Sequence, residues 1–180
     1  MKSSMIWIIL ICIVVAISII ILFSKNEKSS SKDILGDNEI NDFIIDLWIN
    51  YDSNNTYTKE QLVVISLTAY DSEINNGGLC QFFSNSSKEF APNISNSLEE
   101  INAIKHKDLF DKFIKDNKIN LKELDSYESD NVEDFIDKYD DLPFEDFDRK
   151  YYELEKEESI TNLLIEYTKS NYNEIIKEEK

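Results

Sequence analysis

Two adjacent glycines, Gly77 and Gly78, end an apolar helical pattern, and the 180-residue chain has only three glycines in all. Glycine adopts backbone angles that other residues reach only with strain. A Phe-Phe pair follows, and then an Asn-Ser-Ser cluster whose side chains can hydrogen-bond the backbone groups that helix ends leave unpaired. The segment therefore predicts a sharp, polar-braced corner between two helices, with Phe82 and Phe83 in the core.

The segment from Glu73 to Ser87 also resembles a known signature, E-x-N-N-G-G-x-x-Q-F-F-x-N-S-S-G, of the C-terminal domain family of bacterial DNA-mimic proteins. Leu79 occupies a position where an aromatic residue is common, and Lys88 replaces the closing glycine. The resemblance covers residues 62–173 and implies an α-helical fold with a surface that imitates duplex DNA for a DNA-binding partner. The amides and hydroxyls could bind a small ligand, but we interpret the matching residues as a structural motif: Glu73, Asn75, Asn76, Gly77, Gly78, Gln81, Phe82, Phe83, Asn85, Ser86 and Ser87.

Apolar residues at helical spacing recur along the rest of the chain, and no stretch alternates convincingly with period two. Thr58 and Gln61 have the spacing of a capping box that opens a helix, and Ser97 and Glu100 have the same spacing further on. We therefore predict an all-α fold, a single compact multi-helix domain behind one N-terminal transmembrane helix. Besides the helices at these boxes, helices are expected near residues 38–51, 109–116, 127–139 and 159–175.

The N-terminal segment is the most apolar part of the chain, because residues 5–23 contain no charge. At about 1.5 Å per residue, a helix of this length is just under the roughly 30 Å hydrocarbon thickness of a bilayer. A cleaved signal peptide is the alternative, but no small-residue cleavage site follows. We predict a transmembrane anchor over 1–24, a flexible linker over 25–37 and an acidic domain over 38–180. The protein would then be a single-pass membrane protein, with the flanking lysines slightly favouring a cytoplasmic domain.

Charge is the second strong signal, since the chain carries 36 acids and 19 bases, a net charge of −17. Residues 1–32 hold one acid and four bases, so the remainder carries 35 acids against 15 bases, or −20. This exceeds the magnitude of about 2–8 that keeps a small domain soluble. Such a domain repels nucleic acid and attracts basic proteins, so we expect no direct contact with nucleic acid. General solubility is the alternative explanation.

The acids are densest between Glu123 and Glu158, where sixteen acids stand against four bases, a net −12. Aromatic residues punctuate this block, so we expect a folded acidic ridge on the helical core rather than a disordered tail. The residues predicted to bind a protein partner are Asp130, Glu133, Asp134, Asp137, Asp140, Asp141, Glu145, Asp146 and Asp148.

An enzyme would need reactive groups, and the chain offers few. The single histidine, His106, lies between two lysines and is expected to be exposed, while Cys80 is expected to be a small buried hydrophobe. The two could pair as base and nucleophile, but nothing in their spacing supports it. The acids at positions 130, 133, 134 and 137 share one helical face, and they resemble a solvated face more than a metal site. We therefore predict no catalytic residue, no metal and no cofactor.

These observations favour a membrane-tethered, acidic helical interaction protein. Its carboxylates would imitate duplex phosphates and engage a basic protein such as a DNA-binding regulator. An immunity-type inhibitor of a basic nuclease toxin is an alternative, and a hydrolase or metal-dependent enzyme is a third. Formation of a homodimer is left open.

Overall fold

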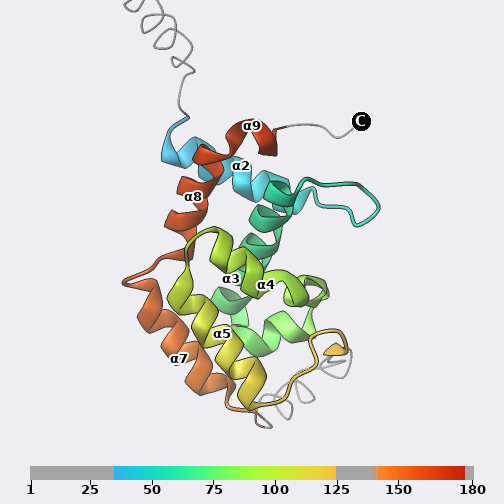
Figure 1. Ribbon diagram of the computed structural model, residues 1–180, viewed down its shortest axis with the longest axis vertical. Coiled ribbons are helices and arrows are strands. Elements are labelled where there is room, and N and C mark those ends of the chain that lie inside the picture. The colour runs from blue at the N-terminus through green and yellow to red at the C-terminus, as the bar shows by residue number, and fades with distance from the viewer. Residues whose placement is uncertain (1–34, 125–139, 141, 177–180) are drawn as a thin grey trace, which may run out of the picture. The chain divides into compact units, whose positions relative to one another are not determined.

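The structure, a computed structural model, describes residues 35–124, 140 and 142–176 (Figure 1). Every regular element in these ranges is helical, so the predicted all-α fold class is confirmed for this part of the chain. The α-helices and one 3₁₀ helix, η1, are α2 (Asp37–Ile49), α3 (Lys59–Ser84), η1 (Ser86–Phe90), α4 (Ala91–Glu100), α5 (Ile104–Asp116), α7 (Phe144–Glu155), α8 (Ile160–Ser170) and α9 (Tyr172–Ile175). The described residues from Gly36 onward form one compact unit. The helix expected over 127–139 lies outside the described residues.

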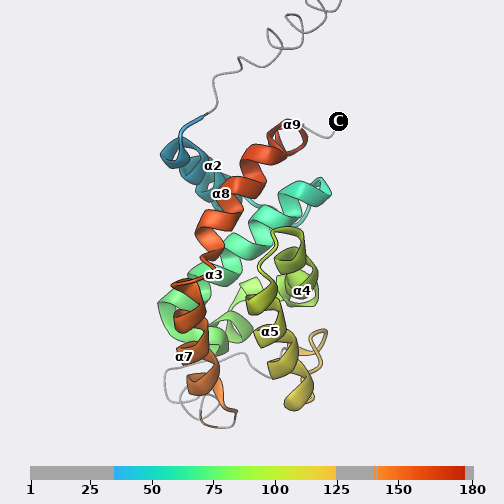
Figure 2. The ribbon, with the colours of Figure 1, turned by 60° about the vertical axis from the view of Figure 1, so that its left-hand side comes forward.

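Helix α3 is the centre of this unit, and it packs against α2, α4, α7 and α8. Figure 2 shows α8 on one side of α3 and α4 on the other. Its first turn is closed by the predicted capping box. The Gln61 amide donates to Thr58 Oγ1 at 3.1 Å, and the Thr58 amide donates to Gln61 Oε1 at 2.9 Å. All eight residues from Val63 to Tyr70 are buried, as a helix surrounded on several sides requires.

The second predicted capping box, at Ser97 and Glu100, is wrong, because both residues lie inside α4. This helix begins earlier, at Ala91, with Pro92 in its first turn, where the missing amide hydrogen of proline costs nothing. The hydroxyl of Ser97 instead makes a hydrogen bond of 3.1 Å with the hydroxyl of Ser66 on α3. Spacing alone does not distinguish a cap from a helix–helix contact.

The core is largely aromatic. The ring of Tyr70 lies 5.2 Å from that of Phe82, 5.7 Å from that of Phe110 and 6.0 Å from that of Tyr151, all nearly perpendicular. Such edge-to-face pairs add stability beyond the burial of their area. Phe82 and Phe83 are both fully buried, as predicted. The aromatic side chains therefore join α3 to α5 and α7.

The predicted single-pass membrane localisation is wrong for the part of the chain that the structure describes. No helix there is both long and apolar enough to cross a bilayer. The longest, α3, has charged residues such as Asp71 and Glu73 in its middle and a kink at its two glycines. The segment on which the prediction rested, residues 5–23, lies outside the described residues.

Candidate functional site

The glycine corner, residues 73–87, includes a sharp kink of α3 at its two glycines and continues past the end of that helix into η1. Gly78 has φ +81° and ψ 179°, in the region that favours glycine, and Gly77 has φ −161° and ψ 22°. A Cβ at Gly78 would lie 2.1 Å from Asp148 Oδ2, and one at Gly77 would lie 2.0 Å from Gln81 Oε1. The corner therefore needs glycine at position 78 for two reasons, its backbone conformation and the close approach of Asp148.

The polar residues of the corner converge on one carboxylate. Glu73 Oε2 accepts hydrogen bonds of 2.8 Å from the side-chain amides of both Gln81 and Asn85. Glu73 Oε1 accepts one of 2.9 Å from the Ser87 hydroxyl. Asn75 donates from its side chain to Asp71, to the backbone oxygen at 2.9 Å and to Oδ1 at 2.8 Å. These hydrogen bonds are made within the chain and give the side chains of Asn75, Gln81, Asn85 and Ser87 structural partners.

The acids predicted to bind a partner are placed very differently from one another. Asp140 and Glu145 are exposed. Asp146 is paired with Arg149 and Lys150, and its hydrogen bond from Lys150 lowers the pKa of its carboxyl. Asp130, Glu133, Asp134, Asp137 and Asp141 lie outside the described residues.

The prediction that Asp148 faces a partner is wrong, because this residue is not on the surface. It is 9% exposed, and its Oδ1 accepts a hydrogen bond of 2.9 Å from the Leu79 amide. That amide follows the kink, where the helical ladder is interrupted and a backbone donor needs another acceptor. Asp148 therefore braces the glycine corner from α7 and is removed from the set that could face a partner.

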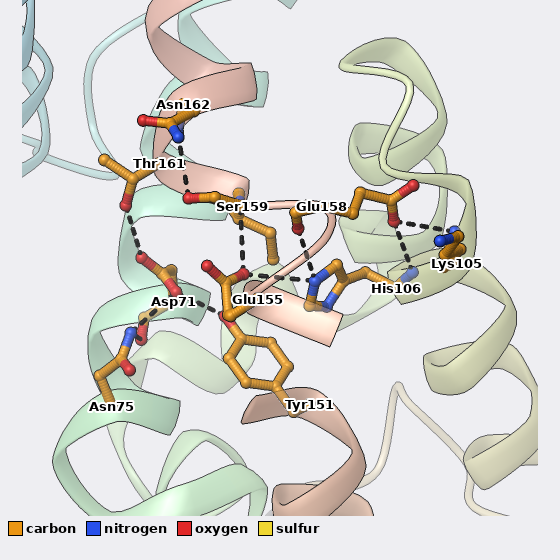
Figure 3. Close-up of polar contacts among 11 residues, drawn as sticks. Asp71, Asn75, Lys105, His106, Tyr151, Glu155, Glu158, Ser159, Thr161 and Asn162 are labelled. Atoms are coloured by element: carbon orange, nitrogen blue, oxygen red, sulfur yellow. Dashed lines mark hydrogen bonds and ion pairs between the residues drawn. The ribbon is translucent and has the colours of Figure 1, made fainter. Parts of the chain in front are cut away.

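A second polar cluster joins α3, α5, α7 and α8 (Figure 3). Asp71 Oδ1 accepts a hydrogen bond of 2.5 Å from the Tyr151 hydroxyl, and its Oδ2 accepts one of 3.3 Å from Thr161. Burial and the neighbouring Asp71 raise the pKa of Tyr151 well above its usual value. The phenol therefore stays protonated and acts as a donor that holds α7 to α3.

His106 occupies the other half of this cluster, and the expectation that it is exposed is wrong, since it is fully buried. Its Nε2 lies 2.9 Å from the backbone oxygen of Glu158 and 3.3 Å from Glu155 Oε1. A carbonyl oxygen can only accept, so Nε2 carries the proton. Burial lowers the pKa of His106 and raises that of Glu155. The imidazole is therefore a neutral structural donor that ties the α7–α8 turn to α5.

The two residues that the sequence offered as base and nucleophile lie in the interior of the fold. Cys80 and His106 are both fully buried, so neither side chain can meet a substrate in this conformation. Within residues 35–124, 140 and 142–176, no group of three or more His, Cys, Asp or Glu side chains is arranged to hold a metal ion.

An acidic groove that the sequence did not reveal lies between α3, α4 and α8. It has a volume of about 410 Å³, and three of its lining residues are Glu60, Glu100 and Glu166. Tyr167 also lines it, and its pKa is raised to about 12, first by burial and then by Glu60 and Glu100. These acids come from distant parts of the chain, so no local motif could have indicated them.

Comparison with known proteins identifies a family. The family model described as DMP19-like protein matches residues 55–171. No curated protein and no solved structure matches the chain. The matched range runs from just before α3 through α8, and it includes both the glycine corner and the acidic groove, whereas α2 and α9 lie outside it.

Proposed function

Because the chain belongs to the DMP19-like protein family, which is a DNA mimic family, we propose that it binds a basic DNA-binding protein in place of duplex DNA. Its carboxylates would take the positions that phosphates occupy in the partner's complex with DNA. The chain would act by occupying the partner's DNA-binding surface, without a chemical step.

The net charge of the chain supports this proposal independently of the family match. Residues 33–180 have a net charge of −20. Self-repulsion of this size destabilises a compact domain, and it is more than solubility needs. A field of one sign also steers a basic partner and raises its rate of association. Duplex DNA is recognised through the same long-range attraction, with one charge per about 1.7 Å of helix axis.

In the described structure, fewer acids are available to a partner than the number of acids in the sequence suggests. Asp140 and Glu145 are exposed, and the acidic groove offers three further carboxylates from other helices. Asp148 and Asp146 contribute less, because one braces the corner and the other is neutralised by its neighbours. The proposed binding surface therefore consists of the outward acids only.

A competition experiment tests the proposal. The full-length chain is immobilised at low salt, incubated with a nuclease-treated lysate of its host, and eluted with duplex DNA of mixed sequence. We expect DNA to release a strongly basic, DNA-binding protein, and we expect capture to fail near 1 M salt, where the Debye length is only about 3 Å. A released nuclease that the chain inhibits would identify the immunity-type role instead.

The control separates electrostatic mimicry from adhesion through other groups. Asp140→Asn with Glu145→Gln should weaken capture, while Asp148 is left intact because its loss would disturb the corner. A partner that DNA does not displace, and that binds equally well at high salt, would refute mimicry of DNA.

A further inference from the structure

A second hollow adjoins the acidic groove at the N-terminal end of α3. This apolar groove has a volume of about 420 Å³ and lies between α3 and α4. Leu62 and Val63 line it from α3, and most of its lining surface is apolar. Glu100 lines both hollows, so the acidic groove and the apolar groove share a wall.

The two grooves offer a partner different side chains, carboxylates in the acidic groove and an exposed leucine in the apolar groove. In the described part of the chain, neither Glu60 nor Glu166 forms an ion pair within 4 Å, whereas Glu100 is paired with Lys59 at 2.5 Å. The hydrogen bond to Glu100 raises the pKa of Lys59, and the charge of Glu60 helps to raise it further. The pair of Glu100 and Lys59 is solvent-exposed, with side chains 39% and 65% exposed, and such pairs contribute little stability. Leu62 is 38% exposed, although most large apolar side chains of α3 are buried.

We propose that the acidic and apolar grooves together bind one basic amphipathic helix of the partner, with an arginine or lysine beside Glu60 and Glu166 and an apolar side chain over Leu62. The choice of occupant follows from charge complementarity in one groove and apolar lining in the next. Side chains three or four positions apart on a helix lie on one face, so a single helix can fill two adjoining hollows. Arginine fits best, because its planar head can donate two parallel hydrogen bonds to one carboxylate.

This inference rests on the proposed function and names the partner's binding element. Lys59 affects the same site, because its ammonium group donates a hydrogen bond to Glu100. A cation on the incoming helix would compete with Lys59 for that carboxylate. Removal of Lys59 should therefore strengthen binding, the opposite of removing an acid.

The probe is a synthetic Ala-rich peptide of about 15 residues, a length at which isolated helices begin to form, with Leu and Arg four positions apart. Its binding to the full-length chain is measured by fluorescence anisotropy at low salt. Two matched peptides carry Arg→Gln or Leu→Ala. We expect the first to lose most of the affinity and the second to lose part of it.

Variants of the chain then locate the site. Glu60→Gln with Glu166→Gln should weaken the Arg peptide about tenfold, because two charge-assisted contacts are lost. Lys59→Met should strengthen it severalfold, and Leu62→Ala should weaken it. Asp108→Asn with Glu123→Gln removes the same charge from two exposed acids outside both grooves and should change affinity less than twofold. Circular dichroism verifies that each variant is folded.

Failure of this inference and failure of the proposed function give different results. If DNA still displaces a captured basic protein, but the Glu60/Glu166 variant captures it and binds the peptide like the wild type, only the groove assignment is overturned. If neither a basic protein nor the Arg peptide binds, both are overturned. A peptide whose binding is insensitive to Arg→Gln contradicts the charge-based choice of occupant.

Discussion

The glycine corner and the acidic groove both depend on carboxylates, but the two regions use them in opposite ways. At the corner, Glu73 and Asp148 accept hydrogen bonds from neutral donors within the chain. In the groove, Glu60 and Glu166 line a hollow, and neither carboxylate forms an ion pair within 4 Å in the described structure. The difference shows that acid content does not measure an interaction surface, because part of the acid excess maintains the fold.

The same division runs through the acidic block of residues 123–158. Asp148 braces the corner, and Glu158 accepts hydrogen bonds from the amides of Lys105 and His106. Glu145 is exposed on the same helix as Asp148. A carboxylate at a helix N-terminus is favourable because it meets unpaired amides, as Glu158 does at the start of α5. Burial and donor geometry therefore separate structural acids from surface acids that are neighbours in sequence.

The largest expected effect is at the corner. Gly78→Val should lower the free energy of unfolding by about 3 kcal/mol or more, because a β-branched residue is strained at positive φ and its Cβ would displace Asp148. Urea unfolding followed by circular dichroism measures it.

Two other glycines serve as controls for that variant. Gly36→Ala should cost no more than about 1 kcal/mol, because a Cβ there lies 3.7 Å from its nearest neighbour and only the preference for Gly over Ala at the N-cap of α2 is lost. Gly77→Ala should fall between them, since its φ is extended and the conflict is with the movable end of Gln81. Unchanged stability of the Gly78 variant would show that the corner does not require glycine.

Neutralising a carboxylate of the corner should cost more stability than neutralising a carboxylate of the groove. Glu73→Gln should destabilise the chain by about 1–3 kcal/mol, because an amide nitrogen replaces one acceptor oxygen and faces a donor. Glu60→Gln should stay within about 0.5 kcal/mol, as surface changes usually do. Thermal unfolding of the two variants measures both. Equal losses would remove the distinction between structural and surface acids.

The buried histidine makes stability depend on pH. Its pKa is lowered from 6.5 by burial, so the unfolded chain binds its proton more readily than the folded chain does. The stability from neutral His106 is therefore fully present above pH 6.5 and is lost as the pH falls through the lowered folded pKa. The melting temperature measured from pH 8 to pH 5 should fall less steeply in His106→Gln than in the wild type.

Glu155 opposes this trend and must be separated from it. Burial raises its pKa above 4.5, so the folded chain holds that proton more tightly, and protonation adds stability as the pH falls through the raised value. In Glu155→Gln the opposing contribution is absent, and the acid-side loss should be steeper than in the wild type. A melting temperature with the same pH dependence in all three proteins would contradict the role given to the cluster.

The smallest effect on stability is expected in the groove. Glu60→Gln with Glu166→Gln should leave the melting temperature unchanged or slightly raise it at low salt, because mutual repulsion is relieved. Added salt should erase the difference by screening. A marked loss of stability would place these acids with the structural carboxylates of the corner.

Several features of the fold were evident in the sequence because they depend on residues close together in the chain. The capping box at Thr58 and Gln61, the kink at the paired glycines and the burial of Phe82 and Phe83 follow from local hydrogen bonding, backbone freedom and helical spacing. Membership of a DNA mimic family was likewise indicated by one short segment.

The tertiary structure decided which polar groups face inward. His106 lies between two lysines, yet it is buried because the turn before α8 supplies an acceptor for its ring. Asp148 belongs to an acidic block, yet it is buried because an amide beyond the kink needs an acceptor. Glu60, Glu100 and Glu166 form one groove because helices far apart in the chain pack together. Helical spacing indicates which face of a helix is apolar. The partner of a polar side chain depends on contacts between distant segments, and only the packed fold specifies those contacts.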